Sequence, residues 1–259
     1  MKRNRPSRPV PTSRTLAAAR AARRELEGMS RPAGEFDASR YFRAADDLQF
    51  FNVGSPNVRA FARRLVQDHP EWTVDEAMAF AEALIADPVL EVKGLAVEVV
   101  ARYRRTFRPS HLAVWKRWLA ANHSANWATT DAICGLLIGP LLVTHPELAV
   151  KLRAWSGNRN LWVRRASAVG LLPGIRRHLH LDQGYATAVA LHPDPADLIH
   201  KAVGWLLREL GKVDAPRLER YLLVHGSAIP RTTVRYAIER FPVAARKRLL
   251  AATKGRLAR

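Results

Sequence analysis

The residues best suited to chemistry are Asp131 and Trp127, which lie four positions apart. Asp131 is the only carboxylate between Glu98 and Glu147. The spacing places both side chains on one face of a helix, and Asn126 is a favourable cap for its start. An aspartate supplies a fixed negative charge or a base for water, and a tryptophan supplies a flat surface for a base or sugar. Their combination therefore indicates a site for reaction at a nucleoside.

The surroundings of Asp131 are strongly basic. The neighbouring cations are Arg102, Arg104, Arg105, Arg108, Lys116, Arg117, Lys151 and Arg153. Nearby positive charge lowers the pKa of a carboxylate, and a surface that binds polyanions usually excludes carboxylates because they repel phosphate. A retained acid favours catalysis, but a surface Asp131 paired with an arginine and a Trp127 in the core are the plain alternatives.

A second cluster runs from Leu161 to Ala166 in a region without acids. Between Glu147 and Asp182 every charged residue is a cation. We expect Trp162 to pack inward, and Arg165, with Arg164 beside it, to contact phosphate. The alternative is a solvated basic face.

A third cluster places Lys201, Trp205 and Arg208 on one stripe of a helix. Two cations and one ring make a poor core face and a good nucleic-acid face, because cations bind the backbone and the ring stacks on a base. Gly204 would allow another helix or a DNA strand to approach closely.

The composition favours nucleic acid as the partner. The chain has 259 residues, 48% of them hydrophobic, with a net charge of +19 and a sequence pI near 11.2. Such charge indicates nucleic acid first and an anionic membrane second. The longest apolar run, Ala132 to Val143, is too short to span a bilayer.

The cysteine and histidine content predicts neither a metal nor another cofactor. Cys134 is the single cysteine, and the nine histidines show no ligand spacing with carboxylates. No secretory apolar segment begins the chain, so we expect an intracellular, cytoplasmic and nucleoid-associated protein.

The pattern along the chain predicts an all-α fold. Residues 1–34, rich in arginine and proline, are expected to form a flexible basic segment, although Thr15 to Leu26 is compatible with a short helix. Residues 35–259 read as one domain of amphipathic helices, in pairs that recur at about 35–45 residues. A HEAT-like helical-repeat solenoid with a concave basic DNA-binding groove is the predicted architecture, and an irregular helical bundle is the alternative.

These clusters resemble the alkylpurine DNA glycosylases of the AlkD family, which have HEAT-like repeats. The likeness extends from about Leu48 to Phe241. It rests on four stretches: Phe51 to Pro56 with Arg59 after it, Trp127-x-x-x-Asp131, Trp162-x-x-Arg165, and Lys201 to Glu209. Asn52 departs from the family pattern, which has glycine at this place.

The resemblance implies roles for particular residues. Asp131 takes the place of the catalytic carboxylate, Trp127 and Trp205 those of the aromatics that flank the lesion, and Arg165 that of the backbone-binding arginine. Tyr41 lies near the place of a further aromatic. The implied protein is a monomer without metal or cofactor that repairs duplex DNA.

The implied reaction is base excision of 3-methyladenine, 7-methylguanine or a related cationic purine. Such a purine leaves as a neutral base, so no second carboxylate is needed to protonate it, unlike ordinary glycoside hydrolysis. The family is understood to act without extruding the base. Two alternatives remain open at this point: a non-catalytic helical-repeat protein that binds DNA or branched DNA, and a protein-interaction scaffold.

Overall fold

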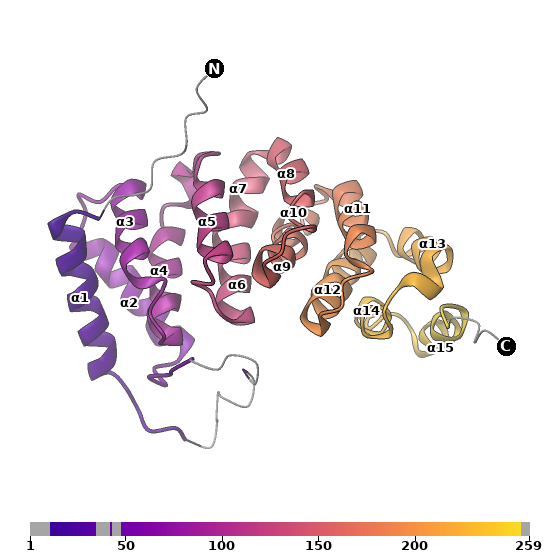
Figure 1. The fold of residues 1–259 in the computed structure, drawn as a ribbon, viewed down its shortest axis with the longest axis horizontal. Helices are drawn as coiled ribbons and strands as arrows, with labels where there is room; N and C mark the ends of the chain where they lie inside the picture. Colours follow the sequence, from indigo (N-terminus) through magenta and orange to yellow (C-terminus); the bar gives the residue numbers. More distant parts are fainter. Residues whose placement is uncertain (1–10, 35–41, 43–47, 255–259) are drawn as a thin grey trace. The chain divides into compact units, whose positions relative to one another are not determined.

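The protein is described by a computed structural model that covers residues 11–34, 42 and 48–254. Helices dominate this part of the chain, and within it the only β-type pairing is an isolated bridge between Gln49 and Val89. The chain divides into two compact units, Met1–Leu141 and Leu142–Arg259, which Figure 1 colours from indigo to magenta and from magenta to yellow. The fold is an all-α helical-repeat fold, as predicted.

The first unit stacks its helices around α4. α1 packs on α3, α2 and α3 pack on α4, and α4 contacts α6. The elements in chain order are α1 (Ser13–Gly28), α2 (Ser55–Asp68), α3 (Val74–Leu84), α4 (Leu90–Ala101), the 3-10 turn η2 (Arg104–Thr106), α5 (His111–Ala120), α6 (Trp127–Ile133) and the π-helical turn η3 (Cys134–Ile138).

The second unit is organised around α12, which packs against α9, α11, α13 and α14. α7 (Gly139–Thr144) contains the boundary between the units. The following elements are the 3-10 turn η4 (Pro146–Leu148), α8 (Ala149–Arg153), α9 (Leu161–Val169), α10 (Leu172–Ile175), α11 (Leu181–Leu191), α12 (Asp197–Val213), α13 (Ala215–His225), the 3-10 turn η5 (Gly226–Ala228), α14 (Arg231–Ala237) and α15 (Val243–Ala252).

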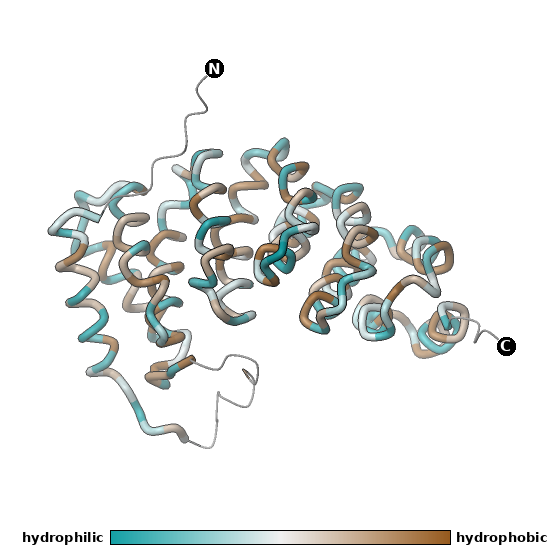
Figure 2. Tube along the Cα trace, in the orientation of Figure 1, coloured by the Kyte–Doolittle hydropathy of each residue, from teal (hydrophilic) through white to brown (hydrophobic). Residues whose placement is uncertain are grey.

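Local sequence sets where these helices begin. Thr73 and Glu76 form a reciprocal capping box at α3, and Asp214 caps α13 by accepting from the backbone N–H of Arg217 at 2.9 Å. Along each helix apolar and polar stretches alternate (Figure 2), as expected where one face is buried. Leu95 and Val99, one turn apart on α4, are fully buried.

The boundary at residue 34 stays a prediction, and the short helix compatible with Thr15 to Leu26 is present. Within the segment predicted to be flexible, Ser13–Gly28 forms α1, capped by Thr12. Ala19, Ala22 and Leu26 are buried on its inner side, because their spacing makes an apolar stripe among the arginines. Residues 35–259 are shared between the two compact units, and the single domain stays a prediction. In a helical repeat each layer contacts only its neighbours, so a long stack separates into locally compact units.

One stretch of the described residues, Trp127–Thr144, is long and apolar enough to cross a membrane by composition alone, with a mean hydropathy of 1.4. Half of it is buried inside the protein. A single such helix is weak support for a membrane span, because core helices meet the same criterion. Here α6 and η3 pack on α4.

Candidate active site and nucleic-acid interface

The start of α6 is fixed by its cap residue. The Asn126 side chain accepts a hydrogen bond from the backbone N–H of Thr129 at 2.8 Å and donates to the Ser124 carbonyl at 2.7 Å. Thr130 donates its hydroxyl back to the Asn126 carbonyl at 2.8 Å. Asn126 is only 1% exposed. The backbone that carries Trp127 is therefore held by buried hydrogen bonds on both sides of the cap.

Trp127 and Asp131 lie one turn apart on α6, each partly exposed. The Trp127 ring stacks on Phe42 with ring centroids 5.2 Å apart and an interplanar angle of 12°. Phe42 in turn lies 5.6 Å from Phe50. Trp127 is thus neither a fully buried core residue nor an isolated surface ring. Tyr41, the further predicted aromatic, lies outside the described residues.

The Asn52 departure from the family pattern has a backbone explanation. Asn52 has φ 56, and Gly54 two residues later has φ 81. Asparagine tolerates the left-handed region better than other residues with a side chain, so it can replace glycine here. Glu91 accepts from the backbone N–H groups of Phe51 at 3.1 Å and Val53 at 3.3 Å, which fixes the same stretch.

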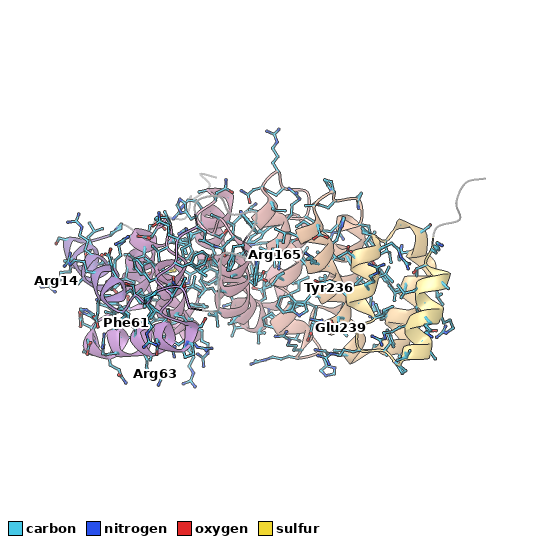
Figure 3. The ribbon with its side chains drawn as sticks, turned by 90° about the horizontal axis from the view of Figure 1, so that it is seen from below. Arg14, Phe61, Arg63, Arg165, Tyr236 and Glu239 are labelled. Atoms are coloured by element: carbon cyan, nitrogen blue, oxygen red, sulfur yellow. The ribbon has the colours of Figure 1, made fainter. Side chains whose placement is uncertain are left out.

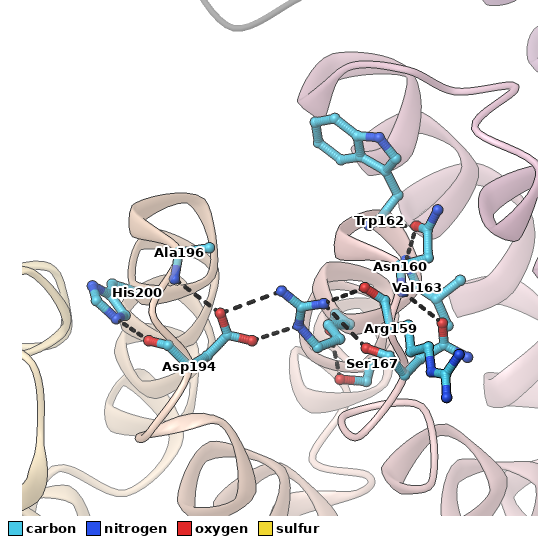
Figure 4. A network of polar contacts seen from close by, with 10 residues as sticks. Arg159, Asn160, Trp162, Val163, Ser167, Asp194, Ala196 and His200 are labelled. Atoms are coloured by element: carbon cyan, nitrogen blue, oxygen red, sulfur yellow. Dashed lines mark hydrogen bonds and ion pairs between the residues drawn. The ribbon is translucent and has the colours of Figure 1, made fainter.

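In the second unit, α9 inverts the expected roles of Trp162 and Arg165. Arg165 is 5% exposed and donates to the backbone carbonyl of Leu198, in the first turn of α12, at 2.6 Å. Trp162 is partly exposed, and its ring points away from the polar network of α9 (Figure 4). The expectation that Trp162 packs inward is therefore wrong. The helix turns Val163 and Ala166 to the core instead.

Arg164 is engaged in an ion pair within the second unit. Its Nε lies 2.5 Å from Asp194, and one guanidinium nitrogen donates to the carbonyls of Asn158 at 3.1 Å and Arg159 at 2.8 Å. Asp194 also accepts from the Ala196 backbone N–H at 2.9 Å (Figure 4). This arrangement joins α9 to the turn before α12.

The predicted stripe on α12 lies at the surface. Lys201, Trp205 and Arg208 are partly exposed, whereas the residues between them are buried. Both cations have carboxylate partners: Lys201 is 2.7 Å from Asp197, and Arg208 pairs with Glu239. The hydrogen bond that Lys201 donates to Asp197 raises the pKa of Lys201. The stripe has the predicted exposure, but its charges are paired.

The lack of a side chain at Gly204 allows α14 to pack closely against α12. A Cβ at this position would lie 2.4 Å from Cβ of Tyr236 and 3.0 Å from the Thr233 carbonyl oxygen, both on α14. Glycine is therefore required for α12 and α14 to pack. The Thr233 hydroxyl donates to the carbonyl of His200 at 2.9 Å across the same contact.

Sequence reasoning missed two groups beside the stripe. Arg176 has its guanidinium 5.9 Å from the ring centroid of Trp205 and is held at 3.0 Å by Glu209. Burial acts to raise the pKa of Glu209, but hydrogen bonds from Lys212 and Arg176 outweigh it and the pKa is lowered. Spacing could not reveal Arg176, because it comes from a different part of the chain.

The second missed group is Tyr236, which is 38% exposed on α14. It packs against Gly204 of α12, and it projects from α14 near Glu239 (Figure 3). An exposed aromatic next to a cationic stripe offers another stacking surface. Its position could not be read from the sequence without knowing that α14 packs at Gly204.

The structure thus assembles two separate sets of predicted residues. Trp127 and Asp131 come together on α6 in the first unit, and Lys201, Trp205 and Arg208 on α12 in the second. Arg165 joins the second set from within, through its bond to α12. No group of three or more His, Cys, Asp or Glu side chains within the described ranges is arranged to hold a metal ion.

Residues 22–241 match the family model of DNA alkylation repair enzymes. The chain belongs to this family. Its fold is also that of a solved structure described as a predicted DNA alkylation repair enzyme from Enterococcus faecalis, with a TM-score of 0.67 and 16% sequence identity. The alignment covers 90% of this chain and 98% of the other. A comparison with curated protein sequences gives no significant match.

The matched range contains α6, α9 and α12. It therefore includes all the candidate site residues that the structure describes. The family's name points to an enzyme that repairs alkylated DNA, with DNA as its partner. The α1 helix lies partly before the matched range, which begins within it.

Proposed function

We propose that this member of the family is a DNA glycosylase that hydrolyses the N-glycosidic bond of purines alkylated at N3 or N7. The observation that carries the proposal is the pairing of Trp127 and Asp131 on one partly exposed face of α6, behind a cap built from buried hydrogen bonds. A helix face whose only role is contact with solvent would not need its backbone fixed by buried hydrogen bonds.

The chemistry needs one carboxylate. An N3- or N7-alkylated purine is cationic, so the bond between C1′ and the base nitrogen breaks with its electron pair moving to the base, which leaves neutral. The sugar acquires oxocarbenium character. Asp131 stabilises this positive charge and orients a water whose oxygen bonds to C1′, and the proton released by the water passes to the carboxylate or to solvent.

Each of the two tryptophans offers a stacking surface to the DNA. Trp127, backed by Phe42, offers its ring to the sugar and the cationic base, for which cation–π attraction and stacking are favourable. Trp205 on α12, with Arg176 near its ring, takes the place of a second aromatic beside the lesion. In this proposal the reacting DNA is a duplex, and the enzyme acts as a monomer inside the cell.

The cations of the second unit bind the DNA backbone. Lys201 and Arg208 lie at the surface, where a phosphate can replace their carboxylate partners. Arg165 has a different part: its 5% exposure and its bond to Leu198 make it a support for the first turn of α12. A direct contact of Arg165 with phosphate stays a prediction, which Arg165→Met tests.

The test is release of 7-methylguanine and 3-methyladenine from methylated duplex, measured under single-turnover conditions. Asp131→Asn should lower the rate by at least about a hundredfold with little change in DNA affinity, because the positive charge of the transition state loses its partner. A matched control is Asp75→Asn, which removes an exposed aspartate of the same unit that pairs with Arg108. It should leave the rate unchanged.

Three results would decide against the proposal or part of it. Unchanged release by Asp131→Asn would remove this residue from the mechanism. No release from any cationic lesion, with salt-sensitive DNA binding intact, would identify a non-catalytic DNA-binding protein. Weak binding that does not depend on salt would favour a protein-interaction scaffold.

A further inference from the structure

Lys93 is a lysine in the interior of the first unit. It lies on α4, and the residue is 3% exposed. Its Nζ donates to the backbone carbonyls of Ile85 at 3.1 Å and His123 at 2.6 Å. Lysine is almost never buried without a specific partner. Here the partners are two backbone carbonyls from segments far apart in the chain.

The second acceptor belongs to a loop with an unusual backbone. Residues 121–126 connect α5 to α6. Asn122 has φ 59 and Ala125 has φ 53, so two residues with side chains adopt the left-handed region within this short connection. Such conformations are unfavourable by themselves and persist where the surroundings impose them. Ser124 and Asn126, between and after them, are buried.

The loop determines where α6 begins. The Lys93 bond reaches the carbonyl of His123, and the next residue, Ser124, accepts from the Asn126 side chain at 2.7 Å. Asn126 then caps α6, whose first residue is Trp127. The part-buried Lys93 bond, the short loop backbone and the buried bonds of Asn126 therefore connect α4 to the helix that carries Trp127 and Asp131.

We propose that Lys93 is a positioning residue of the proposed active site, which fixes the loop 121–126 and thereby the orientation of Trp127 and Asp131. The inference rests on the glycosylase activity proposed above. An apolar side chain of the same length would avoid the cost of burying an ammonium group, but it would leave the Ile85 and His123 carbonyls without this donor. The charged group contributes geometry that packing alone does not supply.

The electrostatic surroundings of Lys93 are simple in the described part of the chain. Burial lowers its pKa to about 8, and the charge of Asp87 opposes this shift. Asp87 lies before α4 and is itself bound by Arg23 at 2.7 Å. His123, whose backbone carbonyl accepts from Nζ, also carries an imidazole. Lys93 therefore changes charge in an accessible pH range.

The first experiment compares Lys93→Met with wild type and with Lys247→Met, which removes an exposed lysine on α15. We expect Lys93→Met to lower the maximal single-turnover rate by at least about tenfold, because small displacements of catalytic groups are costly. DNA affinity should stay within about twofold of the wild-type value, since Lys93 is buried and does not reach the DNA. The amides of residues 121–130 should exchange hydrogen faster, and Lys247→Met should change none of these quantities.

The pH dependence provides a readout that a purely structural role would not move. Raising the pH deprotonates Lys93 in the folded protein. Its hydrogen bonds to the two carbonyls are then no longer charge-assisted and become weaker. The ratio of wild-type to Lys93→Met rates should therefore fall as pH rises through about 8. Titration of the DNA substrate is common to both proteins and cancels in this ratio.

The outcomes separate this inference from the proposed function. Equal rates and equal exchange of residues 121–130 in Lys93→Met and wild type would overturn the role of Lys93. Absence of base release by wild type would overturn the function, yet the exchange measurement would still test whether Lys93 fixes the loop. If Lys93→Met fails to fold, wild type alone decides: protection of the loop amides, corrected for intrinsic rates, should fall relative to α3 as pH rises through about 8. Constant relative protection would refute the proposal.

Discussion

The surroundings of α6 and the stripe on α12 hold their functional side chains by different means. At α6 the polar partners are buried and mostly backbone groups, and they fix the main chain that carries Trp127 and Asp131. On α12 the partners are exposed carboxylates, and they hold only the ends of Lys201 and Arg208. Buried hydrogen bonds give fixed geometry, whereas exposed ion pairs exchange readily for other anions. The first arrangement suits chemistry and the second suits binding.

Arg165 tests this distinction inside the second unit, because it has the charge of the stripe but the burial of the α6 region. Arg165→Met should destabilise the protein by about 2–4 kcal/mol, since it leaves the Leu198 carbonyl without its donor and disturbs the first turn of α12. Lys201→Met, at a partly exposed position, should cost less than about 1 kcal/mol and mainly lower DNA affinity. Urea unfolding and salt-dependent DNA titrations measure the two effects.

If Lys201→Met destabilised the protein more than Arg165→Met, burial would not distinguish a structural cation from a DNA-binding one. If Arg165→Met left stability unchanged but weakened DNA binding severalfold, Arg165 would belong with the phosphate contacts. The Lys201 variant supplies the comparison within the same experiment, because both changes remove one positive charge.

Much of the fold and the stripe could be predicted from the sequence, because both depend on local spacing. The Lys201, Trp205 and Arg208 pattern gave the correct exposed face, and Asn126 gave the correct helix start. These features need only the helical period and the capping preference of asparagine.

Features that depend on the tertiary neighbour could not be predicted in the same way. The burial of Arg165 requires knowledge that Leu198 lies beside it, and the position of Arg176 near Trp205 requires knowledge that α10 packs against α12. For α1, the count of arginines concealed a stripe of small apolar residues. Lys93 gave no local signal at all, because its two acceptors are backbone groups.

Two matched helix caps sharpen the comparison further. Asn126 caps α6, and Asn160 caps α9 by accepting from the backbone N–H of Trp162 at 2.8 Å. Replacing Asn160 by alanine should cost about 1 kcal/mol of stability and replacing the buried Asn126 about 2 kcal/mol, which thermal unfolding would show. The effect on base release should differ: Asn126→Ala should lower the maximal rate about tenfold, because it loosens the backbone of Trp127.

The control for this pair is built into it, because Asn160→Ala loses a cap of the same kind. It should leave the maximal rate within about twofold. Equal losses of rate in the two variants would show that general destabilisation, rather than the geometry of α6, limits the reaction.

The smallest expected effect concerns the carboxylates that pair with the stripe. Asp197→Asn and Glu239→Gln should each strengthen DNA binding by about two- to fivefold at low salt, because they free Lys201 or Arg208 and remove a charge that repels phosphate. The pKa of Lys201, raised by Asp197, should move toward its ordinary value and leave the lysine charged at neutral pH.

The control is Asp182→Asn, which removes an exposed carboxylate on α11 that pairs with Arg217. An increase confined to the first two variants, with a steeper dependence on salt, would place the stripe against phosphate. Equal increases in DNA affinity in all three variants would mean that net charge alone causes the effect. The α12 stripe would then bind DNA no differently from the rest of the basic surface.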